Sequence, residues 1–158
     1  MTRAVLALGS NLGDRLAHLQ AAVEFLAAAD GVHVLGVSPV YETDPVGGPV
    51  QDDFLNAVVV IECDLAPRAL LGVCQEAETA ADRIRVERWG PRTLDVDIVL
   101  VDGVQMHDPE LTIPHPRLYE RDFVLAPLHD LDASRVDIPA DGWTGVRRAP
   151  VTLRVPER

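Results

Sequence analysis

The sequence predicts an α+β protein, a ferredoxin-like βαββαβ sandwich in which a mainly antiparallel sheet is covered by helices. Short runs rich in β-branched residues alternate with two segments whose apolar residues recur at helical spacing. Turn-forming residues separate these segments, and there is no linker, repeat or low-complexity tract. A length of 158 residues suits one core that folds unaided, so we expect residues 1–158 to form a single domain.

The first half of the chain supplies the elements βαββ. The turn GSN leads into a helix for which Asn11 or Asp14 is the expected N-cap, and Gly31 ends that helix. The stretch TDPVGGPVQDD is rich in Pro, Gly and Asp and therefore predicts a long loop between two strands of a hairpin. The expected elements are strands at 3–9, 32–41 and 54–61 and a helix at 16–29.

The second half supplies the remaining helix and strand, followed by shorter pieces. Pro67 suits the first turn of an alanine- and leucine-rich helix. The stretch VDGVQM predicts a turn and a short strand, and IPHP marks a loop. The expected elements are a helix at 66–84, a strand at 93–101, a short helix at 117–123 and an extended piece that ends near residue 155.

Composition excludes several classes of function. The net charge of −11 argues against a general binder of nucleic acid or anionic membranes. All 14 basic residues are arginine, so a P-loop lysine and a Schiff-base lysine are both absent. No signal peptide or membrane span is evident. Cys63 and Cys74 lack metal-ligand spacing and are expected to be free, buried thiols, which favours the cytoplasm.

The stretch LDVDI places two carboxylates, Asp95 and Asp97, on one face of a predicted strand. Their Cα atoms would be about 7 Å apart, so the two charges repel unless a cation lies between them. Val96, Ile98 and Leu100 are expected on the opposite face. A solvated edge strand is the simpler interpretation, whereas a site for Mg²⁺ and phosphate explains the neighbouring arginines as well.

Those arginines form a local cluster of positive charge in an acidic protein. A solvated helix end would account for a charge cluster alone, but the Trp-Gly-Pro break favours a loop that closes over a phosphate. The cluster comprises Arg83, Arg85, Arg88 and Arg92, and the break lies at Trp89–Pro91.

The loop IPHP and two aromatic positions are the remaining candidates. His115 lies between prolines, so it is either a structural turn residue or a ligand-facing group near phosphate. Phe54 with Asn56, and Phe123 with Arg121, would suit a flat heterocycle that stacks and forms hydrogen bonds along one edge. Buried phenylalanines that belong only to the core are the alternative.

Four motifs in this order and spacing resemble the 6-hydroxymethyl-7,8-dihydropterin pyrophosphokinase family: GSNLGDR, YETDPVGGPVQDDFLNAVV, RWGPRTLDVDI and IPHPRLYERDFVLAPL. The resemblance implies an enzyme of folate biosynthesis that transfers pyrophosphate from ATP to the pterin hydroxymethyl oxygen and releases AMP. It also implies a cytoplasmic monomer that binds ATP and the pterin but no nucleic acid or membrane.

The resemblance assigns roles to individual positions. Asp95 and Asp97 would bind two Mg²⁺ ions, and Arg83 and Arg92 would act with them in catalysis. The nucleotide side would comprise Gln75, Glu78, Arg85, Arg88, Trp89, Ile98, His115 and Arg121. The pterin side would comprise Thr43, Pro45, Val46, Phe54, Asn56, Asp95 and Phe123.

Two other kinds of protein remain possible from the residues alone. A metal-dependent phosphohydrolase or nucleotidyltransferase would use the same aspartate pair. A non-catalytic nucleotide-binding module of ferredoxin-like fold would bind nucleotide without turnover. Product analysis separates the enzymes, and AMP formation separates either from the module.

Overall fold

The structure is a computed structural model that describes residues 1–45, 51–81 and 93–156. Its main sheet contains six strands within these residues, and two more strands form a small hairpin. The sheet strands are β1 (Thr2–Ser10), β2 (Val32–Val37), β3 (Tyr41–Thr43), β4 (Phe54–Cys63), β5 (Asp95–Val101) and β8 (Val146–Arg148), and the hairpin strands are β6 (Met106–His107) and β7 (Thr112–Ile113). The helices are α1 (Arg15–Ala28), α2 (Pro67–Ala80), the 3-10 helix η1 (Leu118–Glu120) and α3 (Asp122–Leu131).

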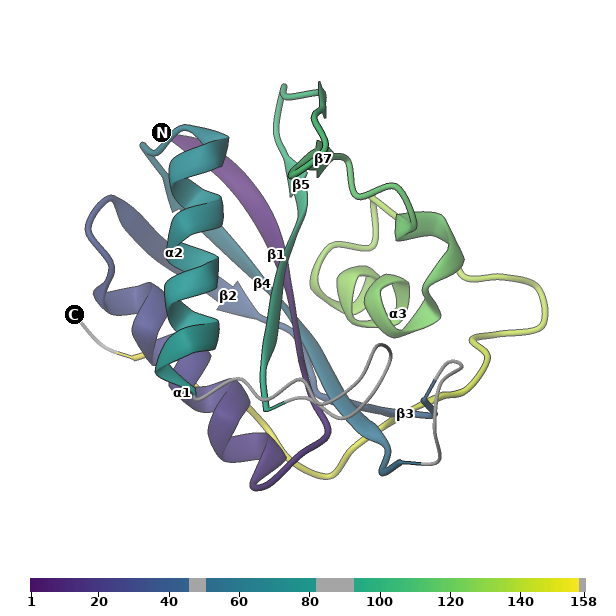
Figure 1. The fold of residues 1–158 in the computed structure, drawn as a ribbon. Coiled ribbons are helices and arrows are strands. Elements are labelled where there is room, and N and C mark those ends of the chain that lie inside the picture. Colours follow the sequence, from purple (N-terminus) through teal and green to yellow (C-terminus); the bar gives the residue numbers. More distant parts are fainter. Residues whose placement is uncertain (46–50, 82–92, 157–158) are drawn as a thin grey trace.

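The main sheet is antiparallel and confirms the predicted βαββαβ order. Strand β1 lies at the centre between β5 and β4, and the far edge of β4 carries β2 at one end and β3 at the other. Strand β8 pairs with the outer edge of β3. In this arrangement the ends of β1, β3, β4 and β5 meet at one end of the sheet, where the candidate site lies (Figure 1).

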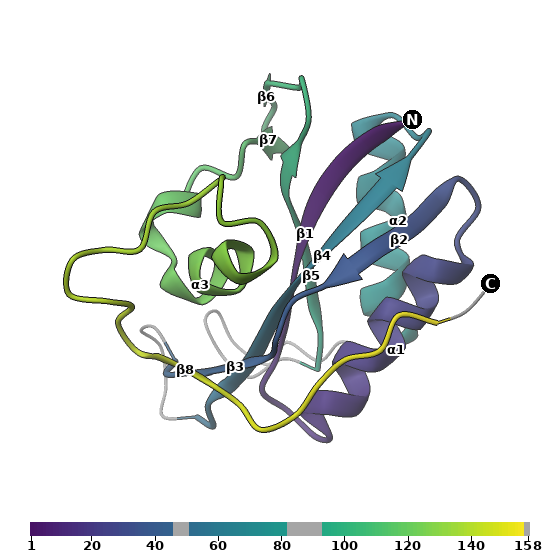
Figure 2. The same cartoon turned by 180° about the vertical axis from the view of Figure 1, so that it is seen from behind.

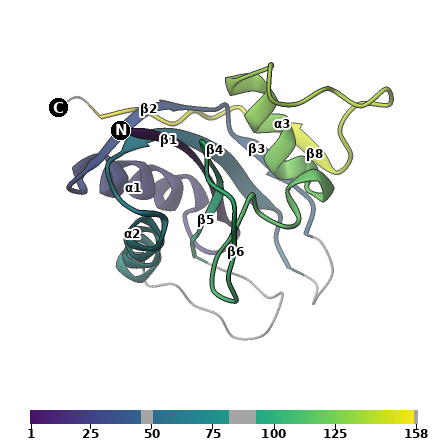
Figure 3. The ribbon, with the colours of Figure 1, turned by 90° about the horizontal axis from the view of Figure 1, so that it is seen from above.

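Helices cover both faces of the sheet. Helices α1 and α2 lie on one face and α3 lies on the other, which the view from above separates clearly (Figure 3). The larger core packs between the sheet and α1 and α2, with Leu6, Leu26 and Leu70 fully buried. The smaller core packs beneath α3 and includes Val58 and Leu128. No helix in the described parts of the chain combines the length and hydropathy that a membrane crossing would need.

Local signals in the sequence account for the first turns of α1 and α2. Asp14 is the N-cap of α1, and its side chain accepts a hydrogen bond from Ala17 N at 3.1 Å. Pro67 occupies the first turn of α2, as predicted.

Cys63 and Cys74 are both free and buried, as predicted. Burial raises the pKa of Cys74 to about 12, so this thiol stays protonated at neutral pH.

The strand predicted at 32–41 is instead two short strands, β2 and β3. Ser38 lies at the break, where its backbone N–H donates to Val58 O and its hydroxyl accepts from Val58 N, each at 2.9 Å. Pro39 follows and has no N–H to continue a ladder. The break lets one continuous strand, β4, pair with β2 along one half and with β3 along the other.

The side chains of β5 alternate between the two faces of the sheet as predicted from Asp95 to Ile98, but not from Val99 onward. Val96 and Ile98 lie in the larger core, whereas Leu100 packs with the smaller core on the opposite side of the sheet. The reason is a register shift, because Leu6 of β1 pairs with Ile98 and Val5 pairs with Leu100. The extra residue, Val99, also lies on the α3 side, so the side-chain alternation changes phase there.

The helix predicted at 117–123 begins as η1 and continues in α3 to Leu131. Pro127 lies inside α3, and a proline inside a helix ordinarily costs about 3 kcal/mol. Burial of the apolar run Val124–Leu128 against the sheet offsets that cost. The apolar packing of this segment therefore outweighs its local helix-breaking signal.

Candidate functional site

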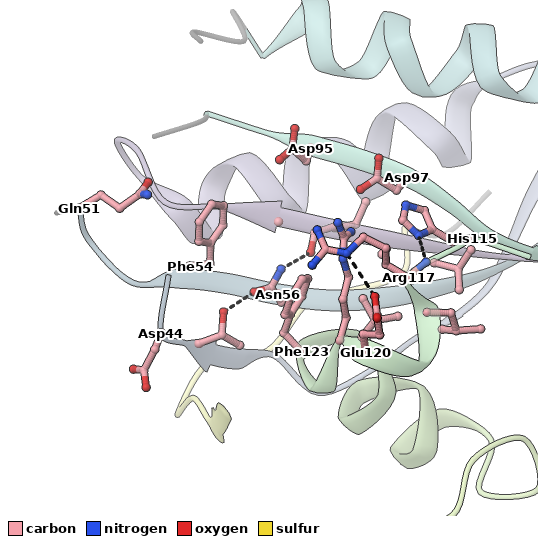
Figure 4. Close-up of a pocket in the computed structure, with 18 residues that line it drawn as sticks. Asp44, Gln51, Phe54, Asn56, Asp95, Asp97, His115, Arg117, Glu120 and Phe123 are labelled. Carbon is pink, nitrogen blue, oxygen red and sulfur yellow. Dashed lines mark hydrogen bonds and ion pairs between the residues drawn. The ribbon is translucent and has the colours of Figure 1, made fainter. Parts of the chain in front are cut away.

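A cavity of about 290 Å³ opens at the end of the sheet where β1, β3, β4 and β5 meet. One wall is β5, another is the segment from His115 to Val124, and the floor is the end of β1 (Figure 4). Predicted site residues that line it are Thr43, Phe54, Asn56, Asp95, Asp97, His115, Arg121 and Phe123. Two of these predicted residues, Thr43 and Phe123, are 80 positions apart in the sequence and still share one cavity.

The two aspartates project from β5 into the same cavity, as the strand pattern predicts. Asp97 is exposed and Asp95 is half-buried, whereas Val96 between them is buried on the other face. The backbone of this strand is fixed on the α2 side, because Glu78 accepts a hydrogen bond from Val96 N at 2.9 Å. Both carboxylates are thus held on a rigid element with solvent access.

The described residues contain no cluster of three or more His, Cys, Asp or Glu side chains that could enclose a metal ion. The carboxylate pair still fits Mg²⁺, which takes one or two protein carboxylates and completes its shell with water and substrate phosphates. It does not fit a structural zinc site, which requires four protein ligands. The chemistry of the donor set therefore favours Mg²⁺ bound together with a phosphorylated ligand.

A buried polar pair lies at the other end of the cavity. Thr43 Oγ1 donates to Asn56 Oδ1 at 2.6 Å, and Asn56 Nδ2 donates to Leu8 O at 3.3 Å (Figure 4). These bonds fix the amide plane and leave one N–H and one lone pair for a ligand. Gly9 makes room for this amide, because a Cβ at Gly9 would lie 2.8 Å from Asn56 Nδ2.

Phe54 and Phe123 line the same end of the cavity from different elements, β4 and α3. The Arg121 guanidinium carbon lies 5.5 Å from the centre of the Phe123 ring. Two aromatic side chains beside a fixed amide form a setting for a flat heterocycle that forms hydrogen bonds along one edge.

The histidine of the IPHP loop is fixed through its backbone and its ring. His115 N donates to Val99 O at 2.9 Å, so the loop is attached at the irregular position of β5. Its Nδ1 accepts from Arg117 N at 3.1 Å, which leaves Nε2 as the protonated nitrogen of the neutral ring. Burial first, and then the charges of Arg121 and Arg117, lower the pKa of His115 below its ordinary value.

Four predicted residues in the described segments do not line the cavity. Ile98 is buried in the larger core, and Gln75 is exposed on α2. The Glu78 side chain accepts a hydrogen bond from the backbone of β5. Pro45 does not line the cavity itself but directly follows Asp44, which does. The remaining predicted residues lie outside the described residues: Val46, Arg83, Arg85, Arg88, Trp89 and Arg92.

Four polar residues that line the cavity were not predicted: Asp44, Gln51, Arg117 and Glu120. Asn11 Nδ2 donates to Gln51 Oε1 at 2.7 Å and to Asp52 O at 3.0 Å, so the first turn anchors the chain just before β4. The placement of Gln51 and Asp44 depends on tertiary contacts, and a proline- and glycine-rich loop carries no periodic signal for them. The position of Arg117 beside His115 was the one available hint.

Comparison with known sequences gives a consistent result. A sequence model of the 7,8-dihydro-6-hydroxymethylpterin-pyrophosphokinase family matches residues 5–133. The chain is 49% identical over 131 residues to the 2-amino-4-hydroxy-6-hydroxymethyldihydropteridine pyrophosphokinase of Methylorubrum extorquens, which covers 83% of each chain. It is 48% identical over 128 residues to the enzyme of the same name from Bacillus subtilis, covering 81% of this chain and 77% of that one.

The fold is also similar to that of a solved structure, a crystal structure of "HPPK-DHPS in complex with substrates". The TM-score is 0.63 at 13% sequence identity, and the similarity covers 82% of this chain. This chain spans about 40% of that longer protein. At this identity the likeness establishes only the shared fold, and the assignment to a family rests on the sequence comparisons.

Proposed function

This chain belongs to the 7,8-dihydro-6-hydroxymethylpterin-pyrophosphokinase family, an ATP-dependent transferase family, and we propose that the cavity described above is its active site. The reaction moves pyrophosphate from ATP to the hydroxymethyl oxygen of the pterin and yields AMP and the pterin diphosphate, in folate biosynthesis. The observation that carries the proposal is that a carboxylate pair and an aromatic-amide pocket share one cavity.

In our proposal, Asp95 and Asp97 would hold two Mg²⁺ ions, which would bind together with the ATP phosphates. The exposure of Asp97 and the position of both carboxylates on one face support this role. Bound Mg²⁺ would supply charge stabilisation for the transferring group and lower the pKa of the hydroxyl. The two carboxylates would fix where that charge is placed, because β5 is held by its pairing with β1 on one side and by the hydrogen bond from Val96 N to Glu78 on the other.

The pterin is proposed to lie between Phe54 and Phe123, with its polar edge against Asn56. The hydrogen bond from Thr43 Oγ1 fixes the orientation of the Asn56 amide. The amide can therefore distinguish hydrogen-bond donors from acceptors on the edge of the heterocycle. Asp95 lies in the same cavity, on the strand next to β1. This supports a pose in which the hydroxymethyl group of a stacked pterin would face the carboxylate pair.

His115 and Arg121 are proposed to contact the phosphates. The neutral His115 ring presents Nε2–H as a donor, because its Nδ1 is already an acceptor for Arg117 N. Arg121 contributes a permanent positive charge on the same wall. Arg83 and Arg92, and on the nucleotide side Gln75, Glu78, Arg85, Arg88, Trp89 and Ile98, are assigned by the family resemblance, as are Pro45 and Val46 on the pterin side.

Catalysis in this proposal comes from positioning and from charge stabilisation. The cavity presents Asp95 and Asp97, which would hold the cations, a histidine whose pKa is lowered, and arginine, which cannot accept a proton. Its other two carboxylates are paired with arginine, Asp44 with Arg147 and Glu120 with Arg117. None of these described side chains is a strong general base aimed at the pterin hydroxyl. Alignment of that hydroxyl with the β-phosphorus therefore supplies most of the rate enhancement.

The test is product analysis with the purified chain, ATP, Mg²⁺ and 6-hydroxymethyl-7,8-dihydropterin. We expect AMP in equal amounts with pterin diphosphate, and no AMP when the pterin is omitted. Release of phosphate without pterin would indicate the phosphohydrolase alternative. Nucleotide binding without AMP would indicate the non-catalytic module.

We also propose that the enzyme works in the cytoplasm, where ATP is available. The two free, buried thiols, Cys63 and Cys74, are consistent with a reducing compartment. Localisation of a tagged chain by fractionation tests this part of the proposal separately.

A further inference from the structure

The family match ends at residue 133, yet the chain continues as a strap that contacts the wall of the cavity. Residues 144–154, which we call the C-terminal strap, run from α3 past β3 and on to α1 (Figure 2). At the α1 end, Leu153 is buried in the larger core, and Gln20 and Arg154 exchange two hydrogen bonds of 2.9 and 3.0 Å. The strap is therefore a docked part of the fold.

The strap extends the hydrogen-bond ladder of β3, the shortest strand beside the cavity. Glu42 pairs with Arg147 and Thr43 pairs with Val146. Asp44 N donates to Gly145 O at 3.0 Å, which continues the contact to the cavity rim. Because Thr43 and Asp44 both line the cavity, the strap supports that wall from outside.

One side chain of the strap contacts both the residue that follows β3 and the residue that precedes β4. The Arg147 guanidinium donates to Asp44 Oδ1 at 3.0 Å and to Glu42 Oε1 at 3.2 Å, and it also pairs with Asp53. Asp44 follows β3 directly, and Asp53 precedes Phe54 of β4. Arg147 thus joins the point where the chain leaves β3 to the point where it enters β4.

The charges in this cluster make Arg147 hard to replace. The carboxylates of Glu42, Asp44 and Asp53 all pair with Arg147. Arg15 Nη1 lies 3.2 Å from Glu42 Oε2 and donates to the backbone carbonyl of Asp53 at 3.0 Å. Without Arg147, the Asp44 and Asp53 carboxylates would therefore lose the ion pair that they share, and Arg15 would balance only the charge of Glu42. Their repulsion would move Asp44 and Asp53 apart and displace Phe54 and Thr43 from the positions they hold around the cavity.

We propose that Arg147 is a positioning residue for the pterin half of the active site, a role that rests on the proposed function. It does not touch the cavity and acts through β3 and the start of β4. The described nucleotide-side residues that line the cavity lie on β5 and in the segment 115–121, neither of which forms an ion pair with Arg147. Loss of Arg147 should therefore weaken pterin binding and leave nucleotide binding unchanged.

The experiment compares Arg147→Gln with Arg154→Gln by calorimetry. Arg154 is a matched control, because it lies in the same strap and its guanidinium forms no ion pair with any of the described residues. First an inert ATP analogue with Mg²⁺ is titrated, and then the pterin is titrated at saturating nucleotide. We expect Arg147→Gln to raise the pterin Kd about fivefold, as for a network of partly exposed ion pairs, and Arg154→Gln to leave it unchanged.

A second variant separates positioning from general destabilisation. Adding Asp53→Asn to Arg147→Gln removes one of the repelling carboxylates and should restore part of the pterin affinity. An unchanged pterin Kd in Arg147→Gln, or an equal loss of nucleotide affinity, would overturn the role of Arg147 while the wild-type activity stands. If the wild-type chain bound no pterin, the proposed function and this role would both be refuted.

Discussion

Replacement of Gly9 by alanine tests how closely β1 and β4 approach at the floor of the cavity. The added Cβ would lie 2.8 Å from Asn56 Nδ2 and 3.6 Å from a ring carbon of Phe54. The second distance is ordinary contact, but the first is too short, so Asn56 must move. Asn56 is 7% exposed and is held by Thr43 on one side and Leu8 on the other, which leaves it little room.

The expected cost follows from that geometry. Overpacking a buried site costs about 1–3 kcal/mol, and a weakened hydrogen bond to a buried amide adds about 1 kcal/mol. We expect Gly9→Ala to lower the free energy of unfolding by about 2–4 kcal/mol. Gly72→Ala is the matched control, because its Cβ would meet nothing within 4 Å in the middle of α2, and it should gain about 0.5–1 kcal/mol.

Urea unfolding measures the loss of stability, and titration with the pterin measures the change in affinity. Gly9→Ala should weaken pterin binding about tenfold because the displaced amide no longer matches the heterocycle, and nucleotide binding should not change. The loss of stability should shrink in an Asn56→Ala background, where the short contact is absent. A Gly9→Ala protein as stable as Gly72→Ala, with unaltered pterin affinity, would refute the proposed placement of Asn56.

Three further predictions address the metal site, the histidine and the strap. Asp97→Asn should reduce AMP formation about 100-fold or more while thermal stability stays close to wild type, and undiminished turnover would contradict its role. Because the pKa of His115 is lowered in the folded chain below 6.5, the unfolded chain binds a proton first as the pH falls. Stability should therefore decrease as the pH drops below about 6.5, and His115→Gln should flatten this decrease in thermal melts. Leu153→Ala should cost about 2–3 kcal/mol, near the low end for a buried leucine because the strap lies at the surface; no loss would mean that the strap is not docked in solution.

Much of the fold could be predicted because local patterns and tertiary packing agree. The β-rich run of β4, the proline in the first turn of α2 and the aspartate cap of α1 each act within a few residues. The α3 helix could not be predicted in full, because Pro127 is a local signal against it and only burial against the sheet overrides that signal. The change of phase at Val99 depends on the register with β1, which one strand does not encode by itself.

The candidate site also contains some residues that could be predicted from the sequence and others that could not. The aspartate pair could be predicted from strand alternation, and the structure brings both side chains into the cavity. The positions of Phe54, Asn56 and Phe123 were expected from side-chain chemistry and family resemblance, and the structure places them together. Gln51 and Arg147 could not be predicted, because each acts through a partner 40 or more residues away.

The most direct test of the account follows the β-phosphorus of ATP. In a reaction with Mg²⁺ and 6-hydroxymethyl-7,8-dihydropterin, ATP labelled at the β-phosphorus should transfer its label to the pterin and leave the AMP unlabelled. Both transferred phosphorus atoms should appear in one pterin diphosphate, and Asp97→Asn should slow the transfer about 100-fold or more. Label that remained in ADP or appeared in free phosphate, with no labelled pterin, would contradict pyrophosphoryl transfer in this cavity.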